Sequence, residues 1–203
     1  MKKLSKYLWF VIALVLFFGV GLLLADKIAL QNDLVRLHVV ANSDSPEDQN
    51  IKLIVRDRIN DYLSEKMQYI TDVEAAKQYI KDNLATLQAV AQETLQGIGC
   101  PDTVNVTLLQ EEFCRRDYDT FSLPSGIYES LRVEIGKGRG KNWWCVVFPA
   151  LCTPTSTESF VSAAVVGGMD QGLANTLSGN KNYEVRFYLL DVIGKIENFF
   201  RFR

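Results

Sequence analysis

A short apolar strand that turns directly into a capped helix is the feature that most constrains the fold of this chain. Residues 34–41 form a β-branched, apolar run, which is typical of a largely buried strand. Ser45 and Pro46 then carry helix start signals, because a serine hydroxyl can accept from a first-turn amide and proline suits the first helical position. The apolar face of this helix comprises Ile51, Ile54, Val55, Ile59, Tyr62, Leu63 and Met67. We expect Lys52 and Arg56 on its polar face and the whole unit to nucleate the domain.

The N-terminal residues have the composition of a membrane-targeting segment. Three lysines (Lys2, Lys3 and Lys6) precede a 19-residue apolar run over residues 7–25 that has no polar face. This order is typical of a secretory signal or an anchor whose basic end stays in the cytoplasm. The run is near bilayer-spanning length and exceeds the usual signal-peptide core of about 7–15 residues. We therefore predict a signal peptide or signal anchor over residues 1–25, with cleavage left open, and one exported domain over residues 26–203.

The charge of the exported part argues against nucleic acid or anionic lipid as its main partner. Three of the 22 basic residues precede the apolar run, so 19 remain against 24 acidic residues, a net charge of −5. Nucleic-acid binding depends on a basic surface. The local basic cluster over residues 136–141 alternates glycine with Lys or Arg and lacks the pattern of a phosphate-binding loop. We interpret this stretch as a flexible connection between strands.

The cysteines permit disulfides but do not indicate a metal site. Cys100, Cys114, Cys145 and Cys152 could form two bridges in three connectivities. We expect a Cys145–Cys152 bridge first, because these two are close in sequence, and four buried free thiols are the alternative. No Cys-x-x-Cys pair exists and there is one histidine, so we predict no metal and no cofactor.

The remaining periodicities predict an α+β fold: a mainly antiparallel sheet with two long helices packed on one face. A capping box over residues 71–74 begins the second helix, which we expect to bend near Asn83. Strands are predicted by alternation over residues 103–110, 128–135 and 143–148, and we expect the last two to form a hairpin.

The pattern weakens after Cys152. We expect a helix to start within residues 156–162, a last strand over residues 183–190 and an amphipathic terminal helix over residues 192–200. The phenylalanines of the terminus would pack either on the body of the domain or on a membrane surface.

The chain shows no convincing catalytic constellation. His38 lies in an apolar strand, so we favour a core histidine over a general base. The catalytic alternative is an exported Cys–His hydrolase with Cys145 or Cys152 as its nucleophile. Neighbouring strand residues point to opposite faces, so one of Trp143 and Trp144 should face solvent and offer a contact site, and a fully buried pair is the alternative. The residues alone favour a binding or signalling role.

Two long motifs resemble the stage II sporulation protein R family. The first is residues 37–49, continued by Lys52, Val55, Arg56 and Asp57. The second is residues 123–133, continued by the glycines at 136, 138 and 140, residues 142–149, Leu151 and Cys152. The resemblance covers roughly residues 34–152.

This resemblance implies a signal of endospore-forming bacteria that is made in the forespore and exported across the forespore membrane to the intermembrane space. There it would activate a membrane-embedded aspartic protease of the mother cell, which then processes a sigma factor precursor. The family member would be an activator and not an enzyme. We expect its receptor-binding face near the turn over residues 42–48 and the strand end over residues 143–152. The candidate contact residues are His38, Asn42, Ser43, Asp44, Arg56, Trp143, Trp144 and Pro149.

Overall fold

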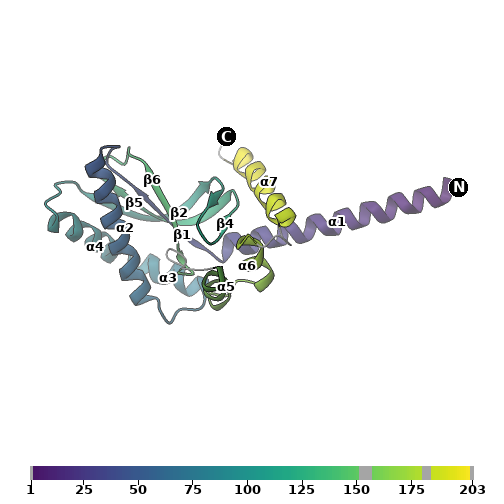
Figure 1. Ribbon diagram of the computed structural model, residues 1–203, viewed down its shortest axis with the longest axis horizontal. Coiled ribbons are helices and arrows are strands. Elements are labelled where there is room, and N and C mark those ends of the chain that lie inside the picture. Colours follow the sequence, from purple (N-terminus) through teal and green to yellow (C-terminus); the bar gives the residue numbers. More distant parts are fainter. Residues whose placement is uncertain (1, 151–156, 180–183, 202–203) are drawn as a thin grey trace.

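The computed structural model describes residues 2–150, 157–179 and 184–201, which form a mixed α+β domain with a long N-terminal helix (Figure 1). The helices are α1 (Lys2–Asn32), α2 (Pro46–Lys66), α3 (Val73–Asp82), α4 (Leu84–Gly97), α5 (Thr157–Val166), α6 (Gln171–Leu177) and α7 (Glu184–Arg201). The strands are β1 (Val35–Val40), β2 (Val104–Phe113), β3 (Arg116–Asp117), β4 (Ser122–Leu123), β5 (Gly126–Ile135) and β6 (Asn142–Phe148).

The central sheet has the strand order β2-β5-β1-β6. β1 runs parallel to β5 and antiparallel to β6, whereas β2 and β5 are antiparallel. The expected hairpin between residues 128–135 and 143–148 is therefore wrong, because β1 lies between these strands. Every residue of β1 is buried, which suits a central strand covered on both faces. The glycine-rich connection passes across the end of β1, where Gly140 donates its amide to the Ala41 carbonyl at 2.8 Å.

The first face of the sheet is covered by α2, α3 and α4, as expected for helices packed on one side (Figure 1). Ser45 caps α2 by accepting from the Asp48 amide, and Pro46 is the first helical residue, so both start signals are confirmed. The predicted bend is a break at Asn83 between α3 and α4. The expected capping box is wrong in detail, since α3 is capped by Asp72, whose carboxylate accepts from the Ala75 amide at 2.8 Å.

The second face is covered at one end by the last turns of α1 and by α5, α6 and α7. The expected strand over residues 183–190 is wrong over its described part, which belongs to α7. Phe187, Leu190 and Asp191 are buried at helical spacing, and an apolar run this short is ambiguous without its packing partners. The start of α5 at Thr157 confirms the helix expected within residues 156–162, of which residue 156 lies outside the described residues.

The N-terminal helix projects from the domain as a single rod (Figure 1). It is long and apolar enough to cross a membrane, with a window of mean hydropathy 2.8 of which none is buried. The helix continues past residue 25, the expected last residue of the signal peptide or anchor, and ends at Asn32. Its last turns enter the domain, where Leu30 is fully buried together with Leu34.

Candidate functional site

The turn after β1 and the glycine-rich connection form one hydrogen-bonded unit. Asn42 Oδ1 accepts a hydrogen bond from the Lys137 backbone amide at 2.9 Å. Asp44 accepts one from the Lys141 backbone amide at 2.7 Å. Asp48 on α2 in turn accepts from the Asn42 amide group at 3.1 Å and from the Ser43 hydroxyl. These short polar side chains replace the backbone partners that an irregular turn lacks. The structure thus brings together two stretches almost 100 residues apart in sequence.

Close packing of this unit explains the glycines. A side chain at Gly140 would overlap the backbone oxygen of Ser43. Gly136 and Gly138 have φ values of +59° and +57°, a backbone region that glycine adopts without strain. Lys52 on α2 also binds this unit, because its ammonium group donates to the Lys141 carbonyl at 3.0 Å. The connection is therefore a loop fixed by hydrogen bonds and not the flexible link that its composition predicted.

Lys52 itself differs from the expectation of a polar, outward-facing residue. It is 5% exposed, and it also donates to Gln49 at 2.6 Å. Burial, followed by the charge of nearby Arg56, lowers the pKa of its ammonium group. Sequence spacing placed Lys52 on the polar face of the helix, but its long stem lets the charged end reach a backbone oxygen of the loop.

Trp143 and Arg56 lie beside this unit, on the α2 side of the sheet. The Trp143 side chain is 38% exposed, and the guanidinium carbon of Arg56 lies 4.2 Å from its ring centroid. Arg56 also donates to Asp57 at 2.7 Å. A guanidinium over an indole face is a cation–π contact, which orients both groups at the surface. Asn42, Ser43, Asp44, Arg56 and Trp143 therefore gather at one end of the sheet, and we name this set the turn face.

The other candidate residues lie elsewhere. Trp144 points to the opposite face of the sheet, where its ring stacks on His38 with centroids 3.7 Å apart. The expected division between the two tryptophans is thus confirmed, with Trp143 the more exposed. Pro149 is buried just after the far end of β6, where an added side chain at Gly167 would overlap it.

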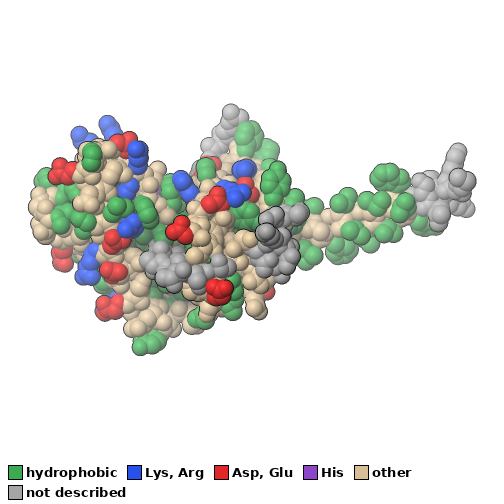
Figure 2. All heavy atoms as spheres, viewed as in Figure 1, with side chains coloured by type: hydrophobic (Ala, Val, Ile, Leu, Met, Phe, Trp, Pro, Cys, Tyr) green, Lys and Arg blue, Asp and Glu red, His purple; other side chains and the backbone are tan. Residues whose placement is uncertain are grey.

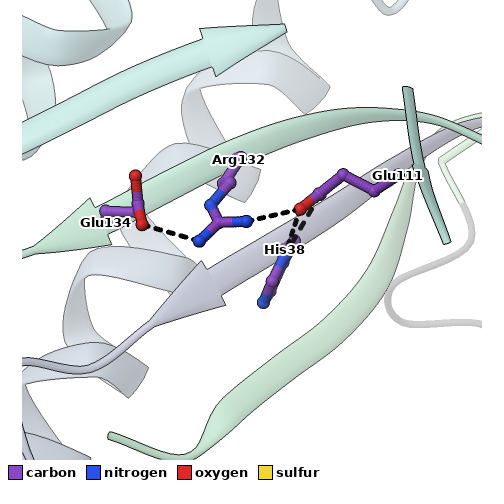
Figure 3. Close-up of polar contacts among 4 residues, drawn as sticks. All are labelled: His38, Glu111, Arg132 and Glu134. Atoms are coloured by element: carbon purple, nitrogen blue, oxygen red, sulfur yellow. Dashed lines mark hydrogen bonds and ion pairs between the residues drawn. The ribbon is translucent and has the colours of Figure 1, made fainter. Parts of the chain in front are cut away.

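A polar network that the sequence analysis did not find lies on the second face, with His38 and Glu111 buried and Arg132 and Glu134 half-buried (Figure 3). His38 Nδ1 lies 3.1 Å from both carboxylate oxygens of Glu111. Arg132 donates to Glu111 at 2.8 Å and to Glu134 at 2.6 Å. Burial alone raises the pKa of the Glu111 carboxyl, but the hydrogen bonds from His38 and Arg132 outweigh it and leave that pKa below its usual value. Charged residues at alternate positions of the predicted strand, Arg132 and Glu134, were the available signal.

The geometry contradicts a Cys145–His38 catalytic pair. Cys145 pairs with Leu37 and belongs to the core on the first face, under α2, α3 and α4. His38 pairs with Trp144, and both side chains lie on the second face. Cys145 is also disulfide-bonded, so its sulfur is not a nucleophile in this state. Cys152, which is both the expected partner in the bridge and the alternative nucleophile, lies outside the described residues. The alternative of four buried thiols is wrong, because Cys114 is free and exposed and Cys100 is free and half-buried.

Within residues 2–150, 157–179 and 184–201, no group of three or more His, Cys, Asp or Glu side chains is arranged to hold a metal ion. The acidic residues of the turn instead accept backbone and side-chain hydrogen bonds, as Asp44 and Asp48 do.

Comparison with known proteins places these features in a family. The family model for stage II sporulation protein R matches residues 31–158, a range that includes the whole central sheet and α2 to α4. A curated relative, stage II sporulation protein R of Bacillus subtilis (strain 168), is 34% identical over 127 residues. The aligned part covers 63% of this chain and 57% of that relative, so the chain spans less than two thirds of the relative's length. No solved structure matches the chain. The chain belongs to the stage II sporulation protein R family.

Proposed function

We propose that this protein is an exported sporulation signal that activates a membrane-embedded aspartic protease of the mother cell and so leads to processing of a sigma factor precursor. The observation that carries the proposal is that two separate family-like motifs meet at the turn face. The first motif supplies Asn42, Ser43 and Asp44, and the second supplies the glycine loop and Trp143. A partly exposed surface whose shape is fixed by hydrogen bonds suits recognition by a receptor.

The receptor-binding residues in this proposal are those of the turn face. Asp44 is exposed, and Trp143 presents an aromatic surface held by Arg56. Asn42 and Ser43 are half-buried and set the shape of the turn. His38, Trp144 and Pro149 face other parts of the domain, so we assign them a supporting role in which they maintain the sheet that carries this surface.

Activation in this proposal is a shift in the receptor's equilibrium. A ligand moves a protein between two states only by binding one of them more tightly, so the turn face must fit the active protease better than the inactive one. No bond is broken by side chains of the signal itself. The separation of His38 from Cys145 supports this non-enzymatic role.

The apolar segment of α1 supports export across the forespore membrane into the space between the two membranes. The direct test is co-expression with the protease and the sigma precursor in a host that does not sporulate. We expect the precursor to be shortened when the full chain is present. A chain lacking residues 1–25 is the matched control, since it keeps the last turns of α1 but loses the apolar run, and it should leave the precursor intact. An intact precursor with the full chain would contradict the proposal.

A further inference from the structure

The last helix packs on the domain through one face and has an exposed apolar face on its opposite side. Its inner face seats Phe187, Leu190 and Asn198 against the domain. Gly194 allows this close approach, because a side chain there would overlap the backbone of Ser125. The outer face carries large exposed apolar side chains. They are Tyr188 (62% exposed), Leu189 (39%), Ile196 (53%), Phe199 (54%) and Phe200 (77%). At 3.6 residues per turn, this set covers about a third of the helix circumference.

Polar contacts fix α7 against the last turns of α1. Arg186 donates to Asp26 at 2.8 Å. Glu197 accepts from Gln31 at 2.8 Å and is also paired with the buried Lys27. The two contact residues of α7 lie 11 positions apart, so together they set the rotation of the helix about its own axis. At 100° per residue the outer face lies opposite Gly194, which packs on the Ser125 backbone, so this face points away from the sheet.

The position of this face relative to the apolar span identifies what could cover it. Asp26 directly follows the apolar run of α1, so the Asp26–Arg186 ion pair marks the level at which that run leaves a bilayer. Figure 2 shows hydrophobic side chains along α7 on the side from which α1 projects. An apolar helical stripe with charges at its edges, held at the level of the headgroups, has the character of an interfacial helix.

We propose that the outer face of α7 rests on the surface of the bilayer that α1 crosses. The proposal rests on retention of α1 as an uncleaved anchor, one of the two alternatives under the proposed export. The occupant is lipid, because the exposed apolar face belongs to a helix that is ion-paired to α1 at the end of its apolar run. The signal is then held with its domain against the membrane, and the turn face is carried at a fixed orientation relative to it.

The test is photo-crosslinking of the full chain reconstituted into vesicles of phosphatidylcholine and phosphatidylglycerol. A benzophenone-bearing phenylalanine analogue is placed, in separate preparations, at positions 10, 69, 196 and 200. Position 10 lies in the apolar run, and position 69 is an exposed tyrosine (87%) beyond the end of α2. All four positions are exposed, so the analogue does not disturb the core.

We expect lipid adducts at positions 10, 196 and 200 and none above background at position 69. Adducts at position 10 without adducts at positions 196 and 200 would overturn the placement of α7, as would crosslinks from these two positions to a second copy of the chain. Absence of adducts at position 10 would overturn the retained anchor and the placement of α7 together. None of these outcomes depends on protease activation, so failure here is distinguishable from failure of the proposed signalling role.

Discussion

The guanidinium of Arg56 lies over the indole of Trp143, with 4.2 Å between the guanidinium carbon and the ring centroid. Arg56 belongs to α2, and Trp143 is the second residue of β6. The contact therefore joins the helical part of the first family-like motif to the strand at the end of the second. It leaves the tryptophan partly exposed at the surface, two residues after Lys141, whose amide donates to Asp44.

Replacement of Trp143 by alanine is predicted to abolish precursor shortening while the domain stays folded. The ring is partly exposed, so loss of its contact with Arg56 should lower the free energy of unfolding by only about 1 kcal/mol. Both quantities are measurable, by immunoblot of the co-expressed precursor and by urea unfolding. The matched control is Tyr69→Ala, an exposed position beyond the last residue of α2, which ends about 15 Å of helix past Arg56. Normal processing by the Trp143→Ala protein would show that the turn face is not the receptor-binding surface.

Gly140→Ala is predicted to distort the turn face through the backbone. The added methyl group would overlap the Ser43 oxygen, so the loop must shift away from the turn. We expect a loss of more than about 1 kcal/mol in the free energy of unfolding and a reduced yield of shortened precursor. Gly97→Ala is the control, since nothing lies within 4 Å of a side chain at that position. Equal free energies of unfolding for the two variants would contradict close packing of the glycine loop on the turn.

The Glu111 network predicts a specific loss of stability in acid. The folded-state pKa of Glu111 lies below the usual value of 4.5, because hydrogen bonds to its carboxylate outweigh burial. As the pH falls, the unfolded chain therefore takes up this proton first, and stability falls through the range from about pH 5 down to the folded-state pKa. Above that range the contribution is fully present.

Glu111→Gln should flatten this part of the stability profile and lower the free energy of unfolding at pH 7 by about 1–3 kcal/mol, because His38 and Arg132 lose a charged acceptor. Urea unfolding at a series of pH values measures both effects. Glu112→Gln, an exposed neighbour on the same strand, is the comparison variant. If both variants change the profile equally, the acid sensitivity does not come from Glu111.

The cysteines should separate into two classes on alkylation without reduction. Cys114, which is free and exposed, should react readily, and Cys145 should react only after reduction. Peptide mapping of the unreduced protein is predicted to show Cys145 linked to Cys152. Cys145→Ser should lower the free energy of unfolding by about 2–5 kcal/mol, whereas Cys114→Ser should have little effect. A link between Cys100 and Cys114 would contradict this assignment.

Local signals were enough to predict the strand–turn–helix unit. A β-branched run, the Ser45 hydroxyl and Pro46 act within a few residues of one another, and all three have the expected role in the structure. The insertion of β1 between β5 and β6 could not be predicted in this way. It depends on pairing between residues about 100 apart, such as His38 with Trp144, which no local pattern encodes.

The candidate site was predictable to a similar degree. Asn42 and Asp44 follow the end of a strand, and turn residues of this type are recognisable from sequence. Their partners on the glycine loop depend on the path of that loop across β1. The Glu111 network depends on register, because Arg132 lies opposite His38 only when β1 and β5 pair as they do here.

The most direct test of the central claim is precursor shortening in a non-sporulating host, measured with and without this chain and with and without the catalytic aspartate of the protease. The account predicts shortened precursor only when the chain and the intact protease are both present. Shortening by the chain with the aspartate-substituted protease would contradict it, because the chain would then have proteolytic activity of its own.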